Sequence, residues 1–267
     1  MKKIILLTGA TDGIGLQTAK QLAAQGHHLL LHGRNQNKLQ QVIDTVSVLP
    51  GAGPVEGFIA DLSNLAEASQ LATQVAQLHG KLDVIINNAG VFSMADPKTV
   101  DGLDARFVVN TIAPLILTQE LLPLLNQSGR VVNLSSAAQA SVDLSALTGS
   151  PTLSDNAAYA QSKLAILMWT QEMAKRYPKG PIFIAINPAS FLGSKMVKDA
   201  YGVAGGDLSI GADILCRAAH SDEFSAANGL YFDNDLGQFS LPHSDARNVA
   251  ISGSVFSALE LFIKQRS

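Results

Sequence analysis

The chain has 267 residues, of which 47% are hydrophobic and 15% are charged. This composition can bury a sizeable core, so it excludes a disordered chain. A net charge of −3 gives no basic field for nucleic acid or an anionic membrane, and the single cysteine, Cys216, excludes an intrachain disulfide and a multi-cysteine metal site.

Targeting and metal signals are weak throughout the sequence. No apolar run reaches the roughly 18 residues of a membrane span, and the run after Met1 is too short for a signal peptide. The six histidines show no HExxH grouping. His28 and His32 have HxxxH spacing, but they lie within an expected strand, and with His27 they are interpreted as structural. We therefore expect a cytoplasmic protein with no membrane span, no nucleic-acid partner and no metal.

The first element is an apolar strand over residues 4–7, followed by the sequence TGATDGIG and then by an apolar-periodic helix that ends near Gly26. Gly9, Gly13 and Gly15 permit a tight turn and a close approach of the backbone to a phosphate at the helix N-terminus. The alternative is a strand–turn–helix whose glycines serve the turn alone. The position of the motif between a strand and a helix favours nucleotide binding.

The second strand, residues 28–32, indicates which nucleotide is bound. An NAD site is expected to place a carboxylate about 20 residues beyond the glycines, but Gly33 stands there and Arg34 follows. A guanidinium can pair with a 2′-phosphate, so the sequence favours NADP(H) over NAD(H). A solvated arginine at a helix start is the alternative, and Asp12 within the glycine turn is an unfavourable charge.

The remaining elements alternate between strand and helix. Further strands are expected at 55–60, 82–86, 129–134, 182–186 and 229–232, and helices at 37–49, 65–78, 103–125, from Tyr159 onward and at 245–265. This alternation predicts one α/β domain over residues 1–267: a doubly wound, Rossmann-type parallel sheet of about seven strands with helices on both faces. Residues 189–206, rich in Gly, Ser and Ala, are predicted to form a substrate lid with a short helix.

Polar residues gather where the strands end, which is the edge at which open parallel sheets bind ligands. Asp61 follows the third strand and could cap the next helix or accept from an adenine amino group. Asn88 and Gly90 follow the fourth strand, and Ser136 follows the fifth. Asn110 lies in an apolar helix, where a hydrogen-bonded core amide is an equally good interpretation.

Tyr159 and Lys163 form the one pair with an evident proton-transfer chemistry. At i and i+4 of a helix their Cβ atoms lie about 5–6 Å apart on one face. An ammonium beside a phenol favours the phenolate and lowers a pKa that is ordinarily about 10. A boundary tyrosine beside a solvated lysine is the alternative reading.

Together these motifs resemble the short-chain dehydrogenase/reductase family over nearly the whole chain, and YxxSKLA with GLYF is similar to its retinol-dehydrogenase-like branch. Two features depart from the family pattern. Ala189 follows Pro188 where the family usually has glycine, and the threonine that often follows is absent, with Ser194 the nearest hydroxyl.

The resemblance implies roles for individual residues. Tyr159 transfers the proton, Lys163 lowers the Tyr159 pKa and holds the nicotinamide ribose, Ser136 hydrogen-bonds the substrate oxygen, and Asn110 anchors a water beside Lys163. Ser136 is preferred to Ser135 because the family uses the second serine of such a pair. The implied cofactor contacts are Gly9, Thr11, Asp12, Gly13, Ile14, Gly15, Arg34, Asp61, Leu62, Asn88, Ala89, Gly90, Tyr159, Lys163 and Pro188.

The resulting prediction is an NADP(H)-dependent oxidoreductase that moves a hydride between the nicotinamide and a small or apolar alcohol or carbonyl. The alternative is a catalytically idle, NADP-binding regulatory protein on the same fold. No GxSxG elbow and no GxxxxGK[ST] loop is present, which argues against a serine hydrolase and a P-loop nucleotidase. Relatives pair through the helices that carry Asn110 and Tyr159, so a homodimer or homotetramer is one option and a monomer the other.

Overall fold

The structure, a computed structural model, describes residues 1–266 and contains one eight-stranded sheet with the order β3-β2-β1-β4-β5-β6-β7-β8. Pairing is parallel throughout except between β7 and β8. The strands are β1 (Ile4–Leu7), β2 (His28–Gly33), β3 (Val55–Ile59), β4 (Leu82–Asn87), β5 (Leu125–Leu134), β6 (Ile182–Asn187), β7 (Tyr231–Asp233) and β8 (Gln238–Phe239).

The predicted doubly wound α/β fold is confirmed, and the predicted strand count is one too low. The extra strand, β8, has two exposed residues and pairs antiparallel with β7. Two exposed residues cannot show the alternation that marks a strand in sequence. The seventh strand lies slightly later than the predicted 229–232, and β5 begins four residues before the predicted 129.

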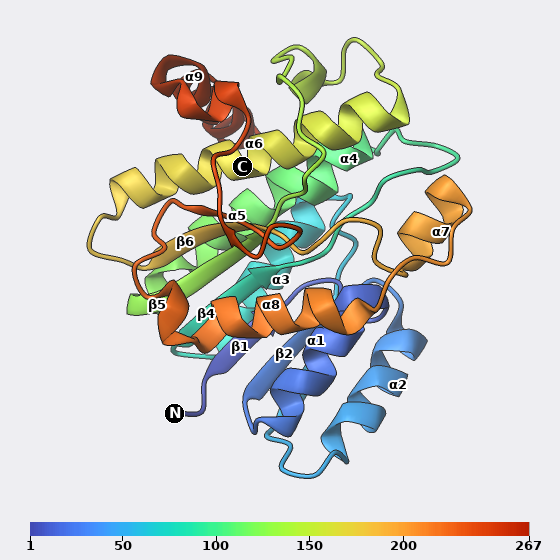
Figure 1. The fold of residues 1–267 in the computed structure, drawn as a ribbon, viewed down its shortest axis with the longest axis vertical. Helices are drawn as coiled ribbons and strands as arrows, with labels where there is room; N and C mark the ends of the chain where they lie inside the picture. Colours follow the sequence, from blue (N-terminus) through green and yellow to red (C-terminus); the bar gives the residue numbers. More distant parts are fainter. Residues whose placement is uncertain (267) are drawn as a thin grey trace.

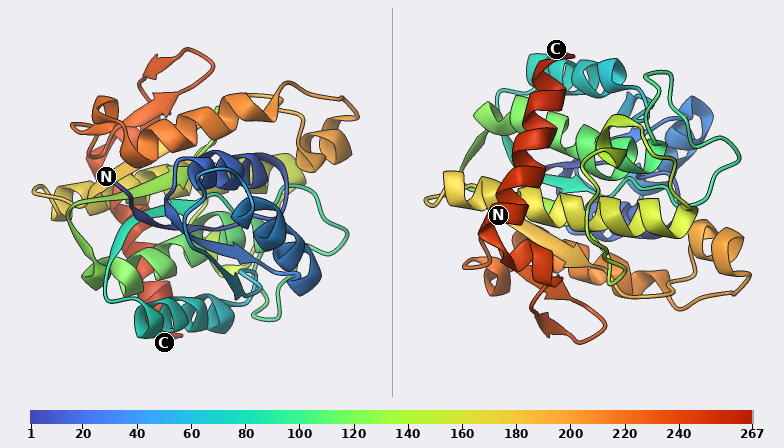
Figure 2. Two further views of the ribbon diagram at one scale, coloured as in Figure 1. Left: turned by 90° about the horizontal axis from the view of Figure 1, so that it is seen from below. Right: turned by 90° about the horizontal axis from the view of Figure 1, so that it is seen from above.

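Helices cover both faces of the sheet (Figures 1 and 2). The main helices are α1 (Gly13–Ala24), α2 (Gln36–Ser47), α3 (Leu65–Leu78), α5 (Ala113–Leu121), α6 (Asp155–Arg176), α7 (Lys195–Tyr201), α8 (Leu208–His220) and α9 (Val249–Lys264). One face carries α1, α2 and α8, and the other carries α3, α5 and α6, with α9 lying outside α6.

Each face has its own hydrophobic core because side chains alternate along the strands. On β1, Leu6 packs into the core beneath α3, α5 and α6, whereas Ile5 and Leu7 pack beneath α1 and α8. All three side chains are fully buried. The short apolar runs in the sequence are therefore strands that are covered on both sides, as expected for parallel sheets.

The stretch 103–125, predicted as one helix, is divided. It consists of α4 (Ala105–Phe107), a π-helical turn (Val108–Ile112), α5 and a 3₁₀ turn (Leu122–Leu124). Such π turns often occur at functional sites, and this one contains Asn110. By length and composition residues 105–124 could also cross a bilayer, but 72% of their apolar window is buried inside the protein, as in a core helix.

Two helices near the C-terminus differ from the sequence expectations. Helix α8, capped by Asp207, was not predicted, and it packs against α1 on the sheet face. Its buried residues include Ala212, Leu215 and Ala219 at helical spacing, so the sequence carried a periodic signal that was not used. Helix α9 starts at Val249 rather than 245 because residues 244–247 form a 3₁₀ turn and Asn248 caps the helix.

Candidate active site

The N-terminal half of α6 carries the predicted proton-transfer pair. Ser154 caps the helix, with its hydroxyl accepting from the Ala157 amide. One turn further on, the Lys163 Nζ lies 5.6 Å from the centroid of the Tyr159 ring. Lys163 is 4% exposed, and its Nζ donates to the Leu134 carbonyl at 2.8 Å. Burial lowers the pKa of Lys163 to about 8, so the ammonium is still charged at neutral pH.

The two serines after β5 are distinguished by their partners. The buried Ser135 hydroxyl donates to the Lys163 carbonyl at 2.7 Å, which ties β5 to α6. The Ser136 hydroxyl accepts from the Ala138 amide at 3.1 Å, and no described residue receives its proton. Ser136 thus keeps a proton that can be donated to a substrate oxygen, and this supports the choice of Ser136 over Ser135.

Asn110 is both a hydrogen-bonded core amide and a neighbour of the predicted site, the two interpretations that the sequence left open. Its buried carboxamide accepts from the Val91 amide at 2.8 Å and donates to the Val91 carbonyl at 3.0 Å. It also donates to the Ser162 hydroxyl. It is therefore a satisfied core amide. It is also close to Lys163, because a methyl group on Gly90 would lie 3.4 Å from Asn110 Oδ1 and 3.6 Å from Lys163 Nζ.

The glycine turn packs directly against the segment that follows β4. A side chain on Gly9, whose φ is +66°, would lie 2.8 Å from the Ala89 Cα, and one on Gly15 would lie 2.1 Å from the Gly9 carbonyl oxygen. Both positions therefore require glycine. The first turn of α1 begins at Gly13, where Asp12 accepts from the Gly13 amide at 2.7 Å, and Thr11 and Ile14 flank this turn.

Asn88 fastens the two cofactor-side segments to each other. Its Nδ2 donates to the carbonyls of Thr8 and Gly9 at 2.9 and 3.0 Å. The Thr8 hydroxyl accepts from the amides of Asn88 and Ala89, both at 3.1 Å. Sequence reasoning missed Thr8, although a hydroxyl between a buried strand and a glycine turn was a usable signal. Asn87 instead points into the core and donates to Asn133.

The strand ends at β2 and β3 form the other side of the site. Arg34 is exposed and has no carboxylate partner among the described residues. A side chain on Gly33 would lie 2.5 Å from Thr11 Cγ2, so the place of the NAD-type carboxylate cannot accept one without a shift. Asp61 does not cap α3, since Asn64 does; its carboxylate accepts from Ser63 instead.

Leu62, the next predicted contact, has a buried side chain in the core, so only its backbone is available to a ligand. The segment after β6 reaches back toward the glycine turn. Ser194 caps α7, and its Cβ lies 3.5 Å from the place a Gly13 side chain would occupy. Pro188 is buried, and its carbonyl accepts from Asn234 at 3.0 Å.

Phe92 is a second residue that sequence reasoning missed. Its ring is 8% exposed and meets the Tyr159 ring edge to face, with centroids 4.9 Å apart. A single phenylalanine after the NNAG motif gives no signal in sequence because the contact depends on the tertiary fold. The arrangement places an apolar ring directly against Tyr159, the predicted proton-transfer residue.

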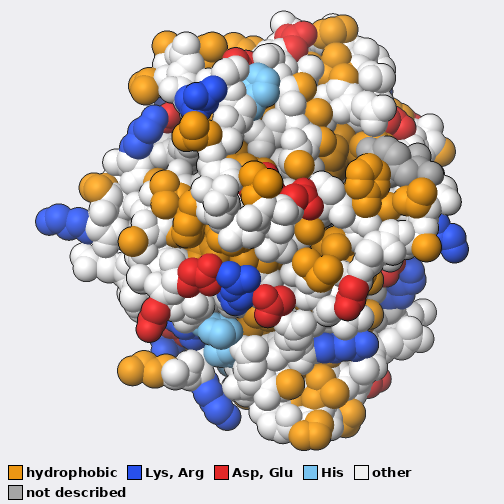
Figure 3. Space-filling view, viewed as in Figure 1, with side chains coloured by type: hydrophobic (Ala, Val, Ile, Leu, Met, Phe, Trp, Pro, Cys, Tyr) orange, Lys and Arg blue, Asp and Glu red, His pale blue; other side chains and the backbone are white. Residues whose placement is uncertain are grey.

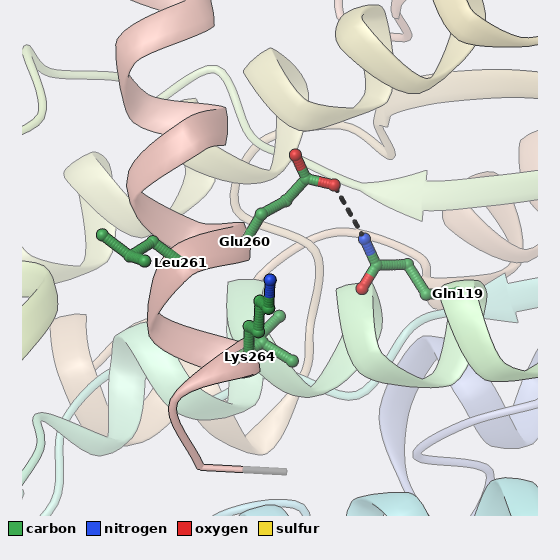
Figure 4. A pocket seen from close by; sticks show the side chains of 5 residues that line it. Gln119, Glu260, Leu261 and Lys264 are labelled. Carbon is green, nitrogen blue, oxygen red and sulfur yellow. Dashed lines mark hydrogen bonds between the residues drawn. The ribbon is translucent and has the colours of Figure 1, made fainter.

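A cavity of about 370 Å³ lies elsewhere, between α5 and α9 (Figure 4). Its lining includes Gln119, Glu260 and Lys264, and none of the predicted site residues contributes to it. Gln119 donates to Glu260 across it at 3.3 Å. Within residues 1–266 no group of three His, Cys, Asp or Glu side chains is placed to hold a metal ion.

Comparison with known proteins places this site in a family. The sequence profile described as short chain dehydrogenase matches residues 3–201. The chain belongs to the short-chain dehydrogenase family. Its relatives include human retinol dehydrogenase 13, which is 28% identical over 93% of this chain and 81% of its own length. The predicted resemblance to the retinol-dehydrogenase-like branch is confirmed.

Two further matches extend the comparison. Human polyprenol dehydrogenase is 36% identical over 65% of this chain and 55% of its own length, so the chain spans about half of that relative. A solved short chain dehydrogenase from Burkholderia cenocepacia in complex with NADP is 27% identical, with a TM-score of 0.69 over 87% of this chain and 95% of that one.

Proposed function

We propose that this chain transfers a hydride between NADP(H) and an alcohol or carbonyl carbon of an apolar substrate. The observation that carries the proposal is the buried Lys163 ammonium beside the Tyr159 ring, at the sheet edge where the glycine turn, Gly90 and Ser136 also lie. The NADP complex of the Burkholderia relative supports the choice of cofactor. We further propose a cytoplasmic location.

The proposed roles follow from the contacts of each side chain. The bound nicotinamide supplies or accepts the hydride. Tyr159 gives a proton to the substrate oxygen during reduction and takes it back during oxidation. Ser136, whose proton is not used by any described residue, donates a hydrogen bond to the same oxygen as negative charge develops there. The buried Lys163 ammonium holds positive charge beside the phenol.

In the proposed cofactor-binding site, the glycine turn binds the bridging phosphates and Arg34 binds the 2′-phosphate. Since a side chain at Gly33 would require Thr11 to shift, discrimination between NADP and NAD falls to Arg34. The adenine would lie near Asp61 and Leu62, and the nicotinamide near Asn88, Ala89, Gly90 and Pro188.

An apolar substrate fits the surface around the proposed lid, residues 189–206. Phe191, Val203 and Ile210 are 58, 43 and 49% exposed, and apolar side chains gather near α7 in Figure 3. With Phe92 against Tyr159, they offer an apolar approach to the proton-transfer residue. Exposed apolar residues gathered in one place are a feature of surfaces that bind apolar ligands.

The test is NADPH and NADH oxidation, followed at the nicotinamide absorbance, against medium-chain and isoprenoid aldehydes and ketones. Turnover should favour NADPH, fall at least about a thousandfold in Tyr159→Phe, and leave NADPH binding in that variant within about twofold. Arg34→Ala should weaken NADPH binding but not NADH binding. Tight NADPH binding without turnover on the whole panel would favour the idle regulatory alternative, and full activity in Tyr159→Phe would refute the proposed role of Tyr159.

A further inference from the structure

His32 is a buried histidine that the proposed mechanism does not use. It lies on β2, one residue before the strand end, and is 3% exposed. Its Nδ1 accepts from the Gly9 amide at 3.2 Å, and its Nε2 bonds to the Ala60 carbonyl at 3.0 Å. One imidazole therefore bridges the glycine turn after β1 and the residue that precedes Asp61.

The two partners fix the protonation state of the ring. A backbone amide can only donate, so Nδ1 must be an unprotonated acceptor, and a carbonyl can only accept, so Nε2 must carry the hydrogen. Burial lowers the pKa of His32 below its ordinary value, although the bond to Ala60 and the charge of Asp61 act in the opposite direction. The ring is therefore neutral at pH 7.

Both backbone polar groups of Gly9 are hydrogen-bonded, and His32 is the partner of one of them. The Gly9 amide points to His32, while the Gly9 carbonyl accepts from Asn88 Nδ2 at 3.0 Å. The Gly9 φ of +66° and the close approach to Ala89 leave this peptide little freedom. Loss of the imidazole would leave a partly buried amide without its acceptor in the turn that leads into α1.

We propose that His32 is a positioning residue of the cofactor site. Its neutral ring sets the glycine turn, which receives the phosphates, in register with residues 60–61, which receive the adenine. This inference rests on the proposed NADP(H) binding and adds to it a residue that acts through Gly9 and Ala60.

The chain offers a matched control in His27, at the opposite edge of the sheet. His27 directly precedes β2, is 5% exposed, and its Nδ1 accepts from the Lys3 amide at 3.1 Å. Burial lowers its pKa to about 4. In each histidine, Nδ1 therefore accepts a hydrogen bond from a backbone amide, but only His32 contacts a segment of the proposed cofactor site.

The experiment measures the NADP⁺ dissociation constant by calorimetry, together with the melting temperature, for wild type, His32→Phe, His32→Asn and His27→Phe. Both phenylalanine variants should melt earlier. Only His32→Phe should bind NADP⁺ about tenfold or more weakly, since it leaves the Gly9 amide unpaired. In His32→Asn the side-chain oxygen can replace Nδ1 as the acceptor, so affinity should stay within about threefold of wild type.

The pH dependence of NADP⁺ affinity, compared between wild type and His32→Asn, gives a second readout. Protonation would place an N–H against the Gly9 amide, so the contribution of His32 is present above its ordinary pKa of about 6.5 and is lost as pH falls. The 2′-phosphate of NADP⁺ also titrates near pH 6, so the expected signal is a steeper loss in wild type than in His32→Asn.

Two results would contradict the proposal, and a third would point elsewhere. If His32→Phe binds NADP⁺ like wild type and its melting temperature falls by as much as that of His27→Phe, His32 is a structural residue only. Identical pH profiles for wild type and His32→Asn would refute the tautomer argument. Absence of NADP⁺ binding in wild type would instead overturn the proposed function itself.

Discussion

Ala189 is the residue whose backbone departs most from what its side chain prefers. Its φ is +116°, in the region that favours glycine, and glycine is what the family pattern leads one to expect there. The neighbouring side chains hold this conformation. Asp235 accepts from the Ser190 amide at 2.8 Å, from the Ser190 hydroxyl at 2.6 Å and from Asn187 at 2.8 Å. Strain of this kind persists only where the surroundings determine the backbone.

Ala189→Gly should therefore stabilise the protein. Relief of the positive φ is worth about 1–2 kcal/mol, and the greater freedom of glycine in the unfolded chain offsets about 0.5–1 kcal/mol of it. Urea denaturation should show a net gain near 0.5–1 kcal/mol. The control is Ala76→Gly at an exposed position of α3, which should lose about 1 kcal/mol. Equal losses in both variants would contradict the strain at Ala189.

At this scale, the sequence was sufficient to place residues of local motifs at one edge of the sheet, while their roles stay predictions. Gly9, Gly15, Asn88, Ser136, Tyr159 and Lys163 lie at strand ends or on one helix face, and the fold brings those edges together. His32, Phe92 and the strain at Ala189 could not be predicted. Each depends on a contact between segments far apart in sequence, or on a backbone angle that the residue type disfavours.

At the scale of elements, the start of α6 is fixed by a buried arginine. Arg106 in α4 is fully buried and binds Asp104 through Nε and Nη2, at 2.8 and 2.6 Å. Its Nη1 also donates to Asp155, the first residue of α6, which in turn accepts from Ser93 at 2.7 Å. The Ser93 bond and the Arg106 charge hold the pKa of Asp155 below its usual value. The network thus joins the segments that carry Gly90, Asn110 and Tyr159.

Arg106→Met should misplace α6 relative to the sheet edge. Removing one partner of a buried ion pair costs about 3–5 kcal/mol of stability. We also expect kcat to fall about tenfold or more, because small displacements of reacting groups are costly, while NADP⁺ affinity stays within about twofold. Denaturation, steady-state kinetics and calorimetry measure the three quantities.

The matched control is Arg176→Met, at the other end of the same helix. Arg176 binds Glu260 through two bonds, at 2.5 and 2.6 Å, but half of its side chain is exposed. Its loss should cost about 1 kcal/mol or less and leave kcat unchanged. If both variants lost the same activity, the network at the start of α6 would have no special role.

The elements themselves were predictable to different degrees. Long apolar-periodic segments such as α3 and the buried strands were found with nearly correct bounds. The division of residues 103–125 was not, since a π turn depends on which carbonyls the surrounding fold engages, and a purely apolar pattern does not encode that. Helix α8 was missed although its buried residues, among them Ala212, Leu215 and Ala219, recur at helical spacing.

At the scale of the whole molecule, α9 occupies the outer surface of the helices through which relatives pair. Figure 2 shows it crossing α6. Glu260 binds Arg176 of α6 and Gln119 of α5, and the Arg176 guanidinium lies 4.4 Å from the centroid of the Phe256 ring. On its inner side α9 buries Val255, Phe256, Leu259 and Phe262. A second chain would have to displace these contacts before it could reach α5 and α6.

We therefore predict a monomer, because a dimer through α5 and α6 would first lose the intramolecular burial of α9. Size-exclusion chromatography with light scattering should give the mass of one chain at micromolar concentration. The remaining route to pairing is the outer side of α9, where Leu261 is 58% exposed. Leu261→Glu tests it: a mass of two chains that this variant reduces to one would place the interface on α9, and a two-chain mass that it leaves unchanged would show that α9 does not prevent pairing.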